Sequence, residues 1–160
     1  MRIGVISDTH IKENILDLPK VILDEFKKVD LILHAGDLVN LSVLDELNKL
    51  AQTKAVVGNM DFPEVVRTLP KKEVIKVGKF KIGLIHGYGP PEGLMERIRK
   101  EFDADIDMIV FGHSHRAVNE TVENVLFFNP GSPTDKIFAP YNSFGIIDIA
   151  SKIKARIITL

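Results

Sequence analysis

The chain has 160 residues, of which 45% are hydrophobic and 27% are charged, a balance typical of one globular domain. The 21 Lys and Arg residues nearly equal the 22 Asp and Glu residues, which argues against a stable nucleic-acid complex. No cysteine is present, which excludes disulfides and thiolate metal sites, and no stretch approaches the ~18 apolar residues of a membrane span. We therefore expect a single soluble, cytoplasmic domain over residues 1–160, without a signal segment or membrane association.

The first part of the chain alternates short apolar runs with amphipathic segments. Residues 3–6, 30–34 and 55–57 are typical of buried strands. Pro19 and Ser42 are typical first-turn and N-cap residues for the two helices between these strands. This alternation predicts a parallel sheet with helices on both faces.

The remainder of the chain predicts more strands than helices. Residues 73–87 alternate apolar and polar residues about a Gly78-Lys79 turn, which is typical of a hairpin. A helix follows Pro90-Pro91, and residues 108–111 form another buried strand. Four closely spaced segments then predict antiparallel strands: 117–122, 124–129, 143–150 and 154–160. We expect these strands to build a second sheet on the first, an α/β fold of two packed mixed β-sheets flanked by α-helices.

Polar residues follow five of the predicted strands where each strand ends. In open α/β sheets, ligands bind outside the carboxyl ends of the strands, so these side chains can meet at one edge. Imidazole, carboxylate and amide donors suit Mn²⁺, Fe²⁺, Ni²⁺ or Zn²⁺. Seven donors are too many for one tetrahedral ion and fit two ions that share a carboxylate. The candidate ligands are Asp8, His10, Asp37, Asn59, His86, His113 and His115.

Two pairs of candidates are separated by one residue, Asp8 with His10 and His113 with His115. In extended chain, residues i and i+2 point to the same side, so each pair is expected to face one pocket. Gly112, just before the second pair, lets the backbone come close. Any one of the histidines alone is more simply explained as a hydrogen-bonded structural residue. It is their joint placement at strand ends that favours a metal site.

The stretches "DTH", "GD", "GNMD", "HG" and "GHSH" occur in this order and resemble the calcineurin-like metallophosphoesterase superfamily. The match runs from Asp8 to His115. The later "NPGSP" resembles the small archaeal and bacterial phosphodiesterase branch, to which the retromer scaffold subunit is related. The resemblance implies a four-layer α/β/β/α sandwich over the whole chain.

The resemblance also assigns ligands and chemistry. It implies two divalent ions, Mn²⁺ or Ni²⁺ before Zn²⁺, Fe²⁺ or Mg²⁺, with Asp37 bridging them. A hydroxide between the ions would attack phosphorus in line, which hydrolyses phosphodiesters and, as a further class, phosphomonoesters. Asp37 and Asn59 are thus also candidate catalytic residues. The first ion would take Asp8, His10, Asp37 and His115, and the second Asp37, Asn59, His86 and His113.

Several residues near these motifs can be interpreted as functional or as structural. Arg116 and Ser132 are candidate contacts for the substrate phosphate, although Arg116 is equally well explained as a solvated surface charge. Met60 stands where the superfamily often has a histidine, and a thioether cannot protonate a leaving group. His34 is expected to be structural because its strand is apolar, and Asp61 to orient neighbouring loops.

The sequence is compatible with two functions. The first is a two-metal phosphodiesterase acting on a small phosphorylated substrate. The second is a catalytically weak binding scaffold of the same fold. The absence of a proton donor at Met60 supports this alternative. Intact ligands at all seven positions favour the enzyme. Small family members often self-associate, so a homo-oligomer is also left open.

Overall fold

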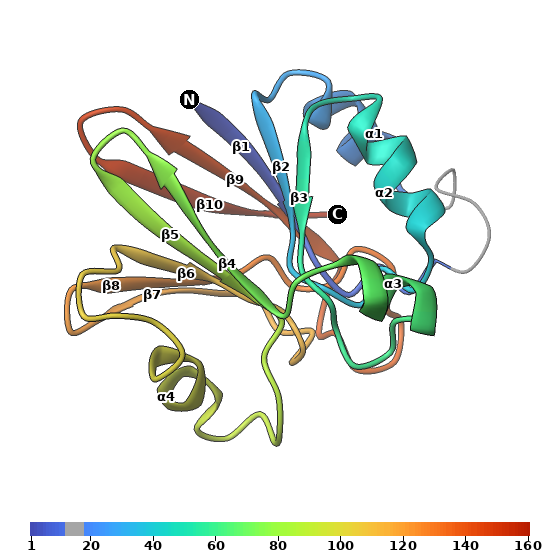
Figure 1. Ribbon diagram of the computed structural model, residues 1–160. Coiled ribbons are helices and arrows are strands. Elements are labelled where there is room, and N and C mark those ends of the chain that lie inside the picture. Colours follow the sequence, from blue (N-terminus) through green and yellow to red (C-terminus); the bar gives the residue numbers. More distant parts are fainter. Residues whose placement is uncertain (12–17) are drawn as a thin grey trace.

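The protein is described by a computed structural model that covers residues 1–11 and 18–160 (Figure 1). Two five-stranded sheets pack face to face, with helices on their outer sides. The strand order is β10-β9-β1-β2-β3 in the first sheet and β4-β5-β6-β8-β7 in the second. This architecture confirms the predicted pair of mixed sheets flanked by helices.

The first sheet combines both ends of the chain. Its parallel part comprises β1 (Arg2–Ile6), β2 (Leu31–His34) and β3 (Thr53–Ala55). β9 (Ser143–Ile149) pairs antiparallel with β1, and β10 (Ile153–Thr159) pairs antiparallel with β9. The prediction that all C-terminal strands build the second sheet is therefore wrong for β9 and β10. Six of the seven residues of β9 are buried, as expected of a strand with packed layers on both faces.

The second sheet begins with the predicted hairpin of β4 (Lys72–Val77) and β5 (Phe80–Ile85). β6 (Met108–Val110) pairs parallel with β5 and with β8 (Val125–Asn129). β7 (Val118–Val122) closes the edge by pairing antiparallel with β8. The carboxyl ends of β5 and β6 therefore point the same way.

In the part of the chain that the structure describes, four helices lie outside the two sheets. α1 (Lys20–Phe26) and α2 (Leu41–Asn48) pack on the first sheet, and α4 (Leu94–Arg99) packs on the second. The short α3 (Pro63–Thr68) follows the loop after β3. Within the described residues, no helix is long and apolar enough to cross a membrane.

Two details of the helices differ from the sequence-based expectation. The first sheet has helices on one face only, because the second sheet covers its other face with apolar side chains. The N-cap of α2 is Asn40, whose side chain accepts a hydrogen bond of 3.0 Å from the backbone N–H of Ser42. Ser42 itself lies inside the helix, so its predicted role as the cap is wrong.

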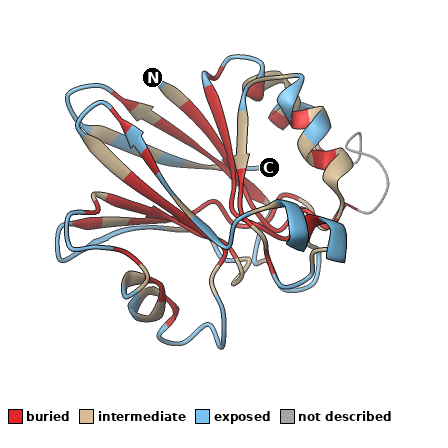
Figure 2. Ribbon diagram, in the orientation of Figure 1, coloured by how far each residue is buried: buried red, intermediate tan, exposed pale blue. Residues whose placement is uncertain are grey.

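Among the described residues, three apolar cores separate the four layers. The central core joins the sheets through residues such as Val5, Leu33, Leu84 and Val110. A second core lies under α1 and α2, and a third lies under α4. Figure 2 shows burial concentrated in the central strands, whereas the outer helix faces and the turns at the opposite ends of the strands are exposed. The buried strands form a rigid base, and the loops at their carboxyl ends are placed by it.

Candidate metal centre

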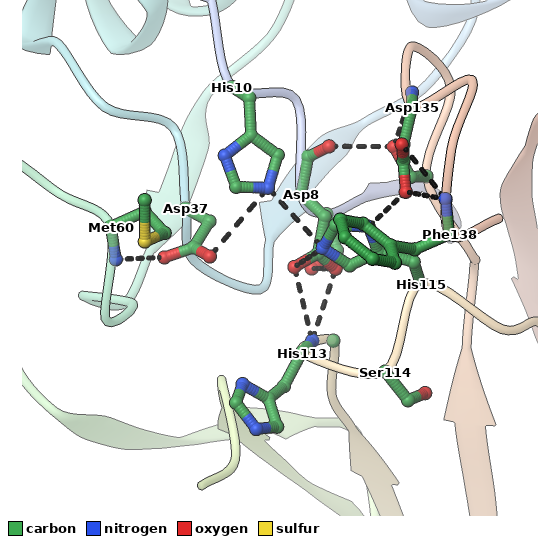
Figure 3. A network of polar contacts seen from close by, with 12 residues as sticks. Asp8, His10, Asp37, Met60, His113, Ser114, His115, Asp135 and Phe138 are labelled. Carbon is green, nitrogen blue, oxygen red and sulfur yellow. Dashed lines mark hydrogen bonds and ion pairs between the residues drawn. The ribbon is translucent and has the colours of Figure 1, made fainter. Parts of the chain in front are cut away.

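The seven candidate ligands all lie in loops that leave the strands at one edge of the sandwich. The loops after β1, β2 and β3 contribute from the first sheet, and those after β5 and β6 from the second. Figure 3 shows several of these side chains pointing toward one another. The structure brings together Asp8, His10, Asp37, Asn59, His86, His113 and His115, in two adjacent groups.

The first group contains Asp8, His10, Asp37 and His115, whose ligand atoms all lie within 4.8 Å of one another. His115 Nε2 lies 3.3 Å from His10 Nε2 and 3.3 Å from Asp8 Oδ1. His10 Nε2 lies 3.7 Å from Asp37 Oδ2. Two carboxylates and two imidazoles therefore converge on one point, which is a donor set suited to a divalent transition-metal ion.

The second group lies next to the first and contains Asn59, His86 and His113. Asn59 Oδ1 is 3.1 Å from His86 Nε2 and 3.0 Å from His113 Nδ1. Asp37 Oδ2, 3.4 Å from His86 Nε2, also faces this group. One carboxylate oxygen of Asp37 thus lies between the two groups.

Hydrogen bonds from the outer ring nitrogens orient two of the imidazoles. His86 Nδ1 lies 2.7 Å from the carbonyl oxygen of Ala35, and His115 Nδ1 contacts the carboxylate of Asp135. Because these partners accept hydrogen bonds, each Nδ1 carries the proton and Nε2 can present its lone pair to the site. Metal-binding histidines in proteins are commonly oriented in this way. The residues present therefore fit a metal centre.

The electrostatics of the cluster also favour a cation. The hydrogen bond to Asp8, opposed by burial and reinforced by Asp135, raises the pKa of His115 to about 9. The pKa of His86 is raised too: burial lowers it, but the hydrogen bond to Asp37 and the charges of Asp8 and Asp37 outweigh burial. The buried carboxylates thus stabilise positive charge at this edge, and a divalent ion can supply that charge.

The backbone at the ligands is left-handed rather than extended. φ is 52° at Asp8, 48° at His10, 57° at Asp37, 69° at His113 and 56° at His115. The predicted extended chain is therefore wrong for both pairs. Asp8 and His10 nevertheless face one group, as predicted, whereas the prediction of one pocket for His113 and His115 is wrong. His115 faces the first group and His113 the second. Such conformations are uncommon for residues other than glycine and cluster at functional sites.

Gly112 brings two buried loops into close contact, as expected. A Cβ at this position would overlap the hydroxyl of Ser7 and lie 2.7 Å from Asp8 Oδ2. Ser7 Oγ in turn donates a hydrogen bond of 2.7 Å to Asp8 Oδ2. The missing side chain of Gly112 therefore leaves the space in which the Asp8 carboxylate is held.

The two predicted substrate contacts are placed differently. Arg116 is exposed and lines a cavity of about 400 Å³ together with His10, Asp37 and His115. Ser132 is fully buried, and its hydroxyl donates a hydrogen bond of 2.7 Å to the carbonyl oxygen of Asp8. This geometry gives Ser132 a structural role in holding the Asp8 loop, in place of the expected substrate contact.

Asp135 is a site residue that sequence reasoning missed. No motif or periodicity in the sequence places it beside His115. We predict that Asp135→Asn weakens divalent metal binding about tenfold or more, since residues that orient a ligand histidine carry effects of this size. Isothermal titration calorimetry of the metal-free protein measures the affinity. Equal affinities of wild type and variant would contradict the orienting role.

Two neighbouring polar residues have structural roles, as predicted. The Asp61 carboxylate accepts backbone hydrogen bonds from Val39 (2.6 Å) and Gly58 (2.7 Å) and so ties two loops together. His34 is almost completely buried, and its Nδ1 accepts a hydrogen bond from the N–H of Gly36 (3.2 Å). Its Nε2 then donates to Thr9 Oγ1, 3.1 Å away. His34 is therefore held as a neutral imidazole.

This burial predicts a pH-dependent stability. Burial, opposed by the charge of Asp8, lowers the pKa of His34 from 6.5 to about 4. The unfolded chain therefore binds the extra proton first, and the free energy of unfolding falls as the pH drops from 6.5 to 4. The loss reaches about 3 kcal/mol. Urea unfolding at a series of pH values, with chelator, should give a flatter profile for His34→Asn. Parallel profiles for the two proteins would rule out this contribution.

Comparisons with known proteins agree with the geometry. Residues 1–152 match the family model of the calcineurin-like phosphoesterase superfamily domain. A protein of Methanocaldococcus jannaschii described as a probable metallophosphoesterase is 38% identical over 163 residues, covering 100% of this chain and 82% of the relative. The structure of an archaeal phosphodiesterase superposes with a TM-score of 0.79 at 26% identity, covering both chains fully.

A second solved structure carries a metal. Vps29 from Entamoeba histolytica in complex with Zn²⁺ superposes with a TM-score of 0.75 at 29% identity, covering 99% of each chain. The family model spans every one of the seven candidate ligands. From its fold, its converging donors and these matches, the chain is a member of the calcineurin-like phosphoesterase superfamily.

Proposed function

We propose that the protein is a two-metal phosphodiesterase in which the two adjacent groups of donors each bind one divalent ion. The position of Asp37 carries this proposal. Its Oδ2 lies 3.7 Å from His10 Nε2 and 3.4 Å from His86 Nε2, between one group and the other. A carboxylate shared in this way is what a pair of closely spaced ions requires.

The bound ions would supply an activated water and neutralise charge on the phosphoryl oxygens. The chain's own residues would hold the ions and orient the ligands and the substrate. The Met60 N–H donates a hydrogen bond of 2.7 Å to Asp37 Oδ1, which leaves Oδ2 for the site. Asn59 offers its amide oxygen between His86 and His113. Arg116, at the cavity wall, is placed to bind a phosphate oxygen of the substrate.

The nature of the ions is part of the proposal. Nitrogen and oxygen donors accept several divalent ions, and we propose Mn²⁺ or Ni²⁺ as the activating metals. The Zn²⁺ complex of the Vps29 relative shows that this fold can also hold zinc. Activity profiles with each metal distinguish these possibilities.

The function is tested by hydrolysis of bis-p-nitrophenyl phosphate and of p-nitrophenyl phosphate. Each substrate is assayed with Mn²⁺, Ni²⁺, Zn²⁺, Mg²⁺ or EDTA, and bound metal is counted by elemental analysis. We expect metal-dependent cleavage with preference for the diester. Preference for the monoester would shift the substrate class to phosphatase substrates. Two bound ions without any turnover would overturn the proposal that the protein is an enzyme.

The last outcome would favour the second candidate, a metal-binding interaction scaffold. Two observations support this alternative. Structures of Vps29 are among the similar folds, and Met60 leaves no proton donor at its position. All seven donors are nevertheless present and converge, so the enzyme is the better supported function.

Met60 limits the range of leaving groups in this proposal. Its side chain is 57% exposed and lines the same cavity as His10 and Asp37. We predict that Met60→His accelerates hydrolysis of alkyl phosphodiesters about tenfold or more, since a positioned general acid contributes roughly 10²–10⁴-fold. Cleavage of p-nitrophenyl esters should change little, because that leaving group needs no protonation. Met60→Leu is the matched control, and equal rates of the two variants on alkyl diesters would refute the prediction.

A further inference from the structure

One aromatic ring beside the metal centre is exposed. Phe138 is 73% exposed, whereas Phe26, Phe111, Phe128 and Phe144 are fully buried. It lies in the segment between β8 and β9 and lines the cavity of about 400 Å³ that contains the ligands of the first group. Met60, which is also exposed, lines the same cavity, so apolar surface gathers beside the candidate ligands and suggests contact with a ligand.

Backbone hydrogen bonds fix the segment that carries this ring. The Asp135 carboxylate, which contacts His115, also accepts hydrogen bonds from the N–H groups of Ile137 (2.8 Å), Phe138 (3.1 Å) and Ala139 (3.0 Å). The Phe138 ring then lies 6.2 Å from the His115 ring, centroid to centroid, at 76°. Figure 3 shows it beside His115. One carboxylate therefore fixes both a candidate ligand and the aromatic ring.

The rest of the cavity wall suits a planar ligand with a negative charge. Met60 and Pro91 add apolar surface, and Arg116 adds a positive charge. A thioether packs well on aromatic groups, and a guanidinium both stacks on planar rings and binds phosphate. An aromatic group attached to the phosphate could therefore lie on Phe138 while its phosphate faces the ligands.

We propose that Phe138 is a stacking platform that selects phosphoesters of nucleosides, whose base lies on the ring. The proposal rests on the proposed function and names the substrate class of the same site. Stacking of a base on an aromatic side chain contributes roughly 1–3 kcal/mol, or about 5- to 150-fold in affinity. Because every base has a flat face, this contact selects the class rather than one base.

Two ligands that differ only in the base test the platform. Dissociation constants of adenosine 5′-monophosphate and of ribose 5-phosphate are measured by calorimetry on the metal-loaded protein. We expect the nucleotide to bind about tenfold more tightly. Phe138→Leu should reduce this ratio to near one without changing the affinity for ribose 5-phosphate or the metal content. Phe138→Tyr should keep the ratio, and Ile137→Ala, which changes an exposed neighbour, is the matched control.

Two results would overturn the platform: a ratio near one in the wild type, or a ratio that Phe138→Leu leaves unchanged. If Phe138→Leu instead changes only self-association in light scattering, the ring belongs to a protein interface and the platform is likewise overturned. The binding ratio is independent of turnover. If bis-p-nitrophenyl phosphate is hydrolysed but the ratio of the two dissociation constants is near one, only the platform is refuted. If the ratio is tenfold but nothing is hydrolysed, only the proposed hydrolysis is refuted.

Discussion

Asp37→Asn is expected to lower the rate of phosphodiester hydrolysis by at least about a hundredfold and to reduce the number of bound ions. Asparagine keeps the size of the side chain, can accept the hydrogen bond from Met60, and tolerates the left-handed backbone at this position. What it removes is the negative charge between His10 and His86. Since bound ions supply several kcal/mol of transition-state stabilisation, losing either one produces an effect of this size.

The measurement combines steady-state kinetics with elemental analysis of the purified variant. Asp45→Asn is the matched control, because Asp45 is exposed on α2, away from the site. It should leave both the rate and the metal content unchanged. A variant at position 37 that retains two ions and the wild-type rate would show that Asp37 does not bridge.

Gly112→Ala should damage both stability and catalysis. The new methyl group would overlap the Ser7 hydroxyl and press on the Asp8 carboxylate, both of which are fully buried. Overpacking of this kind costs about 1–3 kcal/mol. Displacing a candidate ligand by a fraction of an ångström to an ångström costs up to about a hundredfold in rate. Urea unfolding and diester hydrolysis measure the two effects.

A control and a rescue separate the effect of Gly112 from a general loss of stability. Gly78→Ala, in the turn between β4 and β5, has nothing within 4 Å of the new methyl group, although φ there is 59°. It should cost about 1 kcal/mol and leave hydrolysis unchanged. Removing the Ser7 hydroxyl relieves part of the overlap, so Ser7→Ala should restore some activity to Gly112→Ala. An additive double variant would argue against a direct clash.

The sequence predicted the candidate site better than the strand pairing. Polar residues that end buried strands meet at one edge whatever the detailed order of the strands, so the seven candidates could be named in advance. The pairing of β9 with β1 joins residues 2–5 to residues 145–148, and local patterns carry no signal for so distant a partner. The apolar runs located both strands but could not choose between the sheets.

Local backbone geometry was the second feature that the sequence could not predict. The spacing of His113 and His115 suggested one pocket, but tight left-handed turns direct their side chains to different groups. Loop residues were harder still. Asp135 and Phe138 reach the site because a carboxylate gathers three successive backbone N–H groups, an arrangement with no periodicity to detect.

The placement of the first group has a consequence for the integrity of the fold. Asp8 follows a strand of the first sheet and His115 follows a strand of the second, so an ion bound by both would join the two halves of the sandwich. In a chain without cysteine, such an ion would act as a reversible cross-link that closes a loop of roughly a hundred residues, as a disulfide would. Metal supply would then set the lifetime of the folded protein as well as its activity, because a chelator removes both together.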